Sequence, residues 1–302
     1  MNLLTRQCPS CRTATDSRLF RESNVDEGRW TDASFSSRKI PEYMHFTLRT
    51  CSTCGLTYAA AVPTPEVINA AYRSAPFSAG RESRYAARTY ISYLRDADVV
   101  PGTALDIGAG DGAFVRELLA YGFSDVIGIE PSEAPVLSAA EDVRPHLRRE
   151  LFDGERFAAN SFDLVTCFQT IEHVFEPRAL LEAMYRVVKP GGTAFLVAHD
   201  LDALSARILG PKSPIFDIEH LQLFNRRSLH FVLEAAGFRD VRVFSIRNAY
   251  PLSYWLRLFP LPDGLKMRVL GALEHGFLRS LGRRVLALPA GNLGAFGRKN
   301  EA

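Results

Sequence analysis

The feature that most constrains this chain is an apolar segment that runs directly into a glycine-rich turn. Residues 103–108, TALDIG, are mostly apolar, and glycines follow at 108, 110 and 112 before an amphipathic stretch at 111–122. Glycine adopts left-handed backbone conformations and lets backbone approach a ligand closely. The pattern therefore predicts a strand, a turn and a helix, with a nucleotide-like ligand bound at the turn.

The same alternation continues along the chain. Apolar, strand-like segments are expected at 124–130, 146–151, 162–168, 193–199, 240–246 and 292–299. Helical patterns are expected at 66–98, with a break, and at 132–141, 176–188 and 225–238. Strands that alternate with helices in this way predict an α/β fold with a doubly wound parallel sheet.

Charge and hydropathy exclude other classes of protein. The formal net charge of the 302 residues is only +2, which argues against a nucleic-acid partner. No window approaches the ~18 apolar residues of a membrane-spanning helix, and the N-terminus has no signal-peptide pattern. The expected compartment is the cytoplasm.

Four of the five cysteines form two pairs of the CxxC type, Cys8 with Cys11 and Cys51 with Cys54. Without a secretory signal, such pairs indicate metal rather than disulfides. Four thiolates suit tetrahedral, structural Zn²⁺, and reduced thiols or redox pairs are the alternative. We expect a zinc-ribbon-like module at residues 1–62 and one large domain at 63–302.

The glycines alone do not identify the cofactor. Gly108, Gly110 and Ala113 also fit a looser dinucleotide fingerprint, and Glu130 stands where an acid would bind the ribose of NAD. Asp106 favours a different ligand. A carboxylate at the edge of the pocket would repel a pyrophosphate, whereas it suits a ligand with an ammonium and a sulfonium.

Five segments in register extend this pattern. They are ALDIGAGDGAF, VIGIEPS, FDLVTCFQTIEHV, LLEAMYRVVKPGGTAFLVAH and EHLQLFNRRSLHFVLEAAGF, and they lie within about 65–250. Together they resemble the motifs of class I S-adenosylmethionine-dependent methyltransferases, in the subgroup that acts on small molecules such as sugars. The resemblance implies a Rossmann-like methyltransferase sheet.

The resemblance also implies roles for single residues. The methionine part of S-adenosylmethionine is expected to contact Asp106, Gly108, Gly110 and Gly112. The ribose hydroxyls are assigned to Glu130, the adenine amino group to Asp153 with Glu155 as the alternative, and the surroundings of the sulfonium to Gln169.

Methyl transfer to a hydroxyl or carbon acid needs a base, and histidines follow two of the strands. His173, His199 and His220 are the candidates, each with a structural role as the alternative. Sugar carbon-methyltransferases with an N-terminal zinc module have a Tyr-x-Glu-His stretch, which Glu219 and His220 match. Asp217 replaces the tyrosine, so oxygen methylation is at least as well supported. We predict His220 with Glu219 as the base and His173 as a further catalytic residue.

Residues 251–290 interrupt the fold with an apolar and basic stretch. We expect a helical insertion that forms a lid or a homodimer contact, with peripheral membrane contact as the alternative. The predicted acceptor is a sugar, nucleotide sugar, glycan precursor or secondary metabolite. Alternatives are a lipid-linked or quinone-type acceptor, an NAD-dependent oxidoreductase, and a non-catalytic binding module.

Overall fold

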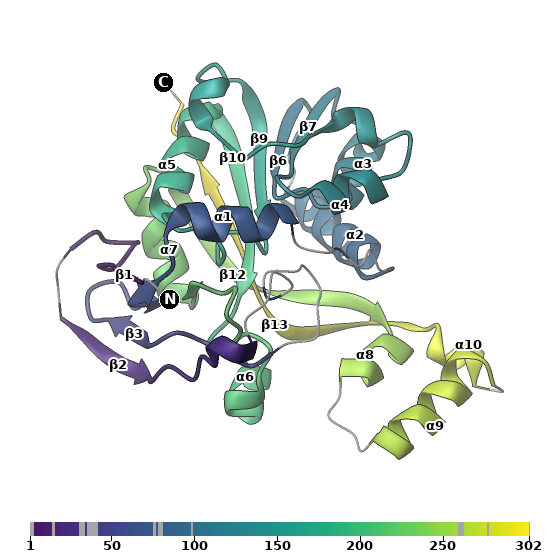
Figure 1. Cartoon of the computed structure of the whole chain (residues 1–302). Coiled ribbons are helices and arrows are strands. Elements are labelled where there is room, and N and C mark those ends of the chain that lie inside the picture. Colours follow the sequence, from purple (N-terminus) through teal and green to yellow (C-terminus); the bar gives the residue numbers. More distant parts are fainter. Residues whose placement is uncertain are drawn as a thin grey trace.

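The structure is a computed structural model that describes residues 3–13, 16–29, 34, 42–74, 77, 81–97, 99–258, 263–276 and 278–301. At its centre, these residues form a seven-stranded sheet in the order β12-β13-β10-β9-β6-β7-β8 (Figure 1). Its strands are β6 (Thr103–Ile107), β7 (Asp125–Ile129), β8 (Leu147–Arg148), β9 (Phe162–Phe168), β10 (Val188–His199), β12 (Arg239–Pro251) and β13 (Val285–Arg298).

Strands β6 to β10 pair in parallel, and β13 runs antiparallel between β10 and β12. The chain order reverses at β6, whose two neighbours are β7 and β9. In such a sheet a crevice opens at the carboxyl ends of the strands where the order reverses. The predicted α/β fold with a doubly wound sheet is confirmed, although the sheet is only mostly parallel because β13 runs antiparallel to both neighbours.

Helices cover both faces of the sheet. The covering helices are α2 (Arg81–Asp96) and α3 (Ala113–Tyr121) on one face and α5 (Pro177–Val187) and α7 (Arg226–Ala235) on the other. The other helices before β12 are α1 (Pro65–Ser74), α4 (Glu133–Ser138) and α6 (Leu204–Leu209). On β9, Val165 and Cys167 belong to the apolar cluster under α5 and α7, whereas Leu164 belongs to the cluster under α2 and α3. Both faces of this strand are thus buried, which explains its uninterrupted apolar sequence.

The N-terminal residues form a second, smaller sheet. Its elements are β2 (Ser17–Arg21), β3 (Leu48–Cys51), β4 (Thr57–Ala59) and β11 (Gln222–Leu223), in the order β11-β4-β3-β2 within the described residues. A separate pair joins β1 (Leu4–Thr5) to β5 (Ala61–Val62). Since β11 comes from far along the chain, the two predicted domains share a sheet. The boundary between residues 62 and 63 stays a prediction.

Strands β12 and β13 continue beyond the sheet as a two-stranded ribbon with three short helices at its end (Figure 1). These are α8 (Leu252–Leu258), α9 (Asp263–Glu274) and α10 (Arg279–Gly282). Both strands are longer than expected, because residues such as Asn248 and Leu288 pair with each other outside the central sheet. Of the predicted insertion at 251–290, residues 259–262 and 277 lie outside the described residues. No helix in the described part is both long and apolar enough to cross a bilayer.

Candidate active site

The glycine turn follows β6, where the sheet order reverses. Gly108, Gly110 and Gly112 all have positive φ angles, of 78°, 55° and 72°. A methyl group at Gly108 would lie 2.1 Å from Oγ1 of Thr170, whereas one at Gly110 would meet no heavy atom within 4 Å. The turn is therefore packed against protein at Gly108 and faces open space at Gly110.

That open space belongs to a cavity of about 640 Å³, here called the site cavity. Its walls come from α1, α2, the glycine turn, the ends of β6, β7, β9 and β10, and the loop before β11. A volume of this size is typical of sites for small molecules and cofactors. No described residue of the 251–290 insertion lines it, so a lid formed by that insertion has no support here.

Two buried acids face the glycine turn. Asp106 is 2% exposed and its Oδ1 accepts a 2.6 Å hydrogen bond from the hydroxyl of Thr166. Burial raises the pKa of Asp106 to about 7. Glu130 accepts hydrogen bonds from the backbone N–H groups of Gly110 and Ser132, and burial raises its pKa too. Both carboxyls line the site cavity, where a cationic ligand would offset their cost of burial.

The two other residues assigned to the cofactor differ from each other. Gln169 lines the site cavity in a left-handed conformation, with φ 47°. Asp153 is exposed and does not line it. Its carboxylate instead accepts a hydrogen bond from the N–H of Glu155 and caps a short 3₁₀ helix. Leu151 and Phe152, just before Asp153, line the cavity, so contact between Asp153 and adenine stays a prediction.

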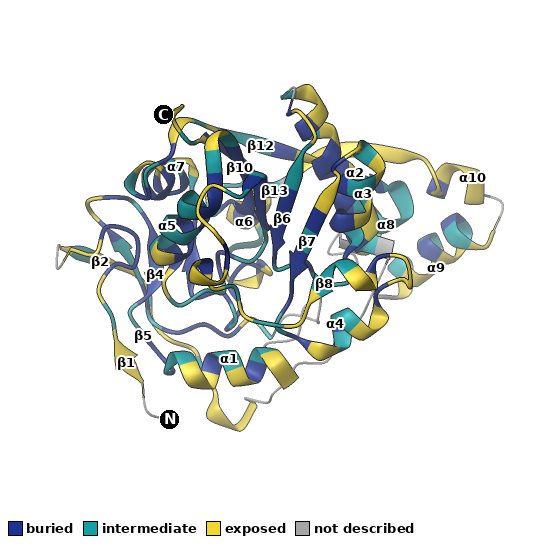
Figure 2. Ribbon diagram, turned by 90° about the horizontal axis from the view of Figure 1, so that it is seen from above, coloured by how far each residue is buried: buried dark blue, intermediate teal, exposed yellow. Residues whose placement is uncertain are grey.

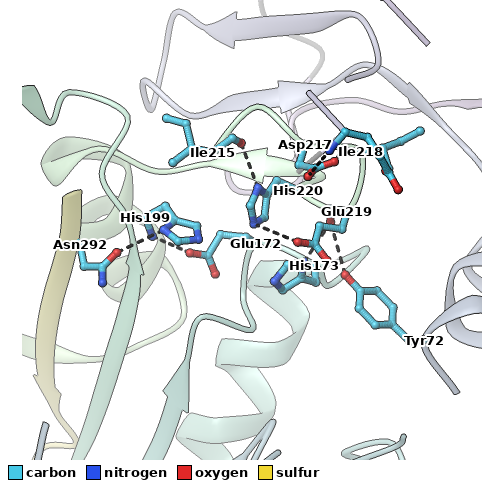
Figure 3. Close-up of polar contacts among 11 residues, drawn as sticks. Tyr72, Glu172, His173, His199, Ile215, Asp217, Ile218, Glu219, His220 and Asn292 are labelled. Carbon is cyan, nitrogen blue, oxygen red and sulfur yellow. Dashed lines mark hydrogen bonds and ion pairs between the residues drawn. The ribbon is translucent and has the colours of Figure 1, made fainter. Parts of the chain in front are cut away.

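The three candidate histidines converge on one wall of the site cavity (Figure 3). The ring centroids of His173 and His199 each lie 4.9 Å from that of His220. They come from three separate segments, after β9, at the end of β10 and before β11. The sequence predicted each histidine near the site, and the fold brings them into contact.

Hydrogen bonds assign the protons on two of these rings. Nδ1 of His220 lies 2.9 Å from the carbonyl oxygen of Ile215, and Nδ1 of His173 lies 3.1 Å from that of Glu219. A carbonyl only accepts, so each Nδ1 must carry the hydrogen and each neutral ring has its lone pair on Nε2. Nε2 of His220 is also 3.9 Å from Oε1 of Glu219, which would stabilise an imidazolium. The arrangement suits a general base.

Asp217, which replaces the tyrosine of the related stretch, is tied to backbone. It is 2% exposed, and its two carboxylate oxygens accept hydrogen bonds from the N–H groups of Ile218 and Glu42. A phenol comes instead from another element. Tyr72 of α1 packs edge-on against His173, and its hydroxyl donates a 3.5 Å bond to the carbonyl of Glu219. Sequence reasoning missed Tyr72.

Glu172 is a second residue that the sequence did not single out. It is fully buried, and its Oε1 accepts a 2.5 Å bond from the backbone N–H of His199 (Figure 3). Its Oε2 has no hydrogen-bond partner in the described residues. Burial raises the pKa of Glu172. Its position in TIEHV, directly before His173, was the sequence signal that could have identified Glu172 as a candidate site residue.

The N-terminal part holds the histidine-bearing segments through Arg6. The guanidinium donates hydrogen bonds to the carbonyls of Ala59, Phe175 and Leu221 and to Oε1 of Gln222. Burial lowers the pKa of Arg6 to about 10, so it stays charged near neutral pH. Arg6 thereby connects the first strand to the segments that follow β9 and precede β11.

Replacing Arg6 with alanine is expected to lower the free energy of unfolding by about 2–3 kcal/mol, because buried carbonyls lose a charged donor. Denaturant unfolding would measure this. Arg12→Ala is the matched control, since Arg12 forms a half-exposed ion pair with Glu182 and should change stability by less than about 0.5 kcal/mol. Equal effects of the two substitutions would contradict the anchoring role of Arg6.

The predicted cysteine cluster is present. The Sγ atoms of Cys8, Cys11, Cys51 and Cys54 all lie within 4.8 Å of one another, and all four residues are buried. Cys8 and Cys54 are 3.5 Å apart, and Cys11 and Cys51 are 3.6 Å apart. These separations are too long for disulfides and close to the ~3.8 Å edge that Zn–S bonds of ~2.3 Å give in a tetrahedron. The donor set therefore fits zinc.

Comparisons with known proteins agree with this geometry. A family model described as a methyltransferase domain matches residues 79–243. The ubiquinone biosynthesis O-methyltransferase of Hahella chejuensis is 34% identical over 115 residues, which cover 35% of this chain and 47% of that protein. The protein of the same description from Pseudomonas paraeruginosa is 35% identical over 103 residues, covering 31% and 43%. The matched segment thus spans less than half the length of these relatives.

Among solved structures, a chain similar in fold comes from the complex between the Haloferax volcanii Trm112 methyltransferase activator and a methyltransferase. The TM-score is 0.50 at 20% sequence identity, and the match covers 74% of this chain and 92% of that one. At this identity the likeness shows a shared fold.

Proposed function

We propose that this chain, which belongs to the methyltransferase domain family, transfers a methyl group from S-adenosylmethionine to an oxygen of a small-molecule acceptor. The observation that carries the proposal is the His220 ring, whose Nδ1 is fixed by the carbonyl of Ile215 on the wall of the site cavity. A ring held in one tautomer presents a defined proton acceptor to the cavity.

The charge of the cavity at the glycine turn supports S-adenosylmethionine as the cofactor. Asp106 would bind the ammonium, Glu130 the ribose hydroxyls, and the backbone at Gly108 and Gly110 would contact the methionine part. When bound, the sulfonium supplies a methyl group already activated for in-line displacement. The protein then has to align the acceptor oxygen and remove its proton.

Proton removal is assigned to His220. Its Nε2 would accept the proton of the acceptor hydroxyl, and Glu219 at 3.9 Å would stabilise the resulting imidazolium. His173 and Tyr72, which pack against each other, would orient the acceptor. The same base would serve a carbon acid, so carbon methylation is the nearest alternative reaction.

The acceptor is proposed to be a hydroxyl compound such as a sugar, nucleotide sugar, glycan precursor or secondary metabolite. A quinone-type or lipid-linked acceptor is the second candidate, supported by the ubiquinone biosynthesis O-methyltransferases among the relatives. Release of S-adenosylhomocysteine with a panel of nucleotide sugars and a panel of catechols would distinguish the two classes. Turnover with amines alone would contradict oxygen methylation.

The affinity for S-adenosylhomocysteine is expected to rise about tenfold between about pH 6 and about pH 8. Burial raises the pKa of Asp106 from 3.8 to about 7, and the ligand ammonium binds the ionised carboxylate. The stability of the ligand-free protein should change in the opposite direction. The free energy of unfolding that a neutral Asp106 contributes is lost as pH rises through 7. Calorimetric titration at several pH values measures the binding effect.

Asp106→Asn is the control for that titration. Its affinity should be weaker at about pH 8 and nearly constant over the range, since no ionisation remains at this position. A slope that persists in Asp106→Asn would assign the effect to another group, such as Glu130. Titration with NADH belongs to the same experiment, because binding of NADH alone would contradict the proposed cofactor.

The cysteine cluster is proposed to hold one structural zinc ion. With four protein thiolates, the ion would have no open position for a substrate. Its role would be to fix the segment of Cys8, two residues from Arg6, against the segment of Cys51.

A further inference from the structure

The end of the ribbon formed by β12 and β13 exposes apolar surface. Residues 251–290 are here called the arm. On β13, residues 285–289 are all exposed (Figure 2). On α9, Leu270 and Leu273 are buried, whereas Leu265 and Met267 are 53% and 69% exposed. Large exposed apolar side chains concentrated in one segment of the chain are candidates for a binding surface.

The arm is also strongly basic. It contains six Lys and Arg and two Asp and Glu, a net charge of +4, although the whole chain has only +2. One of the two acids, Glu274, is paired with Arg257. The remaining basic side chains show no ion pair within the described residues, and they are Lys266, Arg268, Arg279, Arg283 and Arg284.

Exposed leucine and methionine interspersed with arginine favour one kind of partner. An anionic lipid surface accepts apolar side chains below its headgroups and attracts the basic residues around them. A second copy of the arm would bring the same positive charge into contact, since a symmetric dimer apposes identical patches. The charge therefore argues for a membrane surface over self-association.

We propose that the arm is a peripheral docking surface for membranes that contain anionic lipid. Leu265 and Met267 of α9 and Leu286 and Leu288 of β13 would enter the headgroup region, with Arg283 and Arg284 at the phosphates. This inference goes beyond the proposed function, because it holds whichever acceptor is methylated and whether or not the protein turns over.

Flotation of the full-length protein with lipid vesicles tests the proposal. Vesicles of phosphatidylcholine with about one third phosphatidylglycerol should bind the protein at about 0.1 M NaCl, and pure phosphatidylcholine should bind it at least about tenfold more weakly. Raising NaCl to about 1 M should weaken binding, because it screens the arginines. Equal binding to both vesicle types, or none to either, would overturn the proposal.

Two double variants locate the contact. Leu265→Ser with Met267→Ser, and Arg283→Gln with Arg284→Gln, should each weaken vesicle binding by about tenfold. Val100→Ser with Leu137→Ser is the matched control, because these side chains are 78% and 63% exposed but lie outside the arm. All variants should keep the melting temperature and the affinity for S-adenosylhomocysteine, which confirms folding.

Two further results would distinguish a lipid surface from other partners of the arm. Loss of binding in the control as well as in the arm variants would overturn the assignment to the arm. Sedimentation velocity that shows a dimer lost in the arm variants, without any vesicle binding, would identify a self-association surface and overturn the proposal.

Discussion

Replacing His220 with alanine is expected to lower kcat by about 10²- to 10⁴-fold, the usual contribution of a positioned general base. The affinity for S-adenosylhomocysteine should stay within about twofold of the wild-type value. His220 lies on the cavity wall formed by the three histidines and not at the glycine turn. Steady-state kinetics with an identified acceptor and calorimetry with S-adenosylhomocysteine would measure the two effects separately.

His230→Ala is the matched control for this prediction. His230 is 43% exposed on α7, pairs with Glu234 and does not line the site cavity, so turnover should be unchanged. Glu219→Gln should lower kcat less than His220→Ala, since Glu219 acts through the imidazolium. Unchanged turnover in His220→Ala would exclude His220 as the base and leave His173 as the next candidate.

Removing one thiolate is expected to empty the metal site of the N-terminal module. In Cys51→Ser the zinc content should fall from about one ion per chain to below about 0.1. Structural zinc sites contribute on the order of 10 kcal/mol to folding, so the small sheet should lose cooperative unfolding. Elemental analysis and thermal unfolding of the purified protein would measure both.

The consequences for activity follow from Arg6. Loss of the cluster would free the segment that contains Arg6, and with it the carbonyls of Phe175 and Leu221 near the histidines. Turnover should therefore fall while cofactor affinity is retained. Cys167→Ala is the control, because Cys167 is buried in the central sheet and not in the cluster. The zinc content of this variant should be unchanged. Zinc-free wild-type protein with full stability would contradict the zinc assignment.

Much of the fold could be predicted because its signals are local. The strand expected at residues 162–168 is β9, since a strand covered on both faces needs an unbroken apolar run. The outer parts of β12 and β13 could not be predicted. Their pairing, for example of Tyr250 with Leu286, depends on two segments more than thirty residues apart, and neither shows a regular alternation.

The candidate site also has a part that local motifs predicted and a part that they did not. Asp106 lies on β6, and the glycine turn and Glu130 directly follow β6 and its neighbour β7, so clear motifs mark all three and the structure places them together around the cavity. Tyr72 comes from a helix 147 residues before Glu219, and no local pattern relates it to the histidines. The adenine contact was assigned to Asp153, but its neighbours Leu151 and Phe152 line the cavity instead. Spacing in the sequence cannot fix which residue of a loop faces the site.

The sequence by itself determined the α/β fold, the glycine turn and the two CxxC pairs, because each depends on periodicity or spacing within a short segment. Only the tertiary structure decided how the candidate catalytic side chains are arranged. The tautomer of His220 is set by a carbonyl five residues away in a folded loop. Tyr72 reaches the same wall from a distant helix, and Arg6 holds the neighbouring Leu221 carbonyl from the N-terminal part. Such contacts arise from packing between elements, and no local sequence pattern encodes that packing.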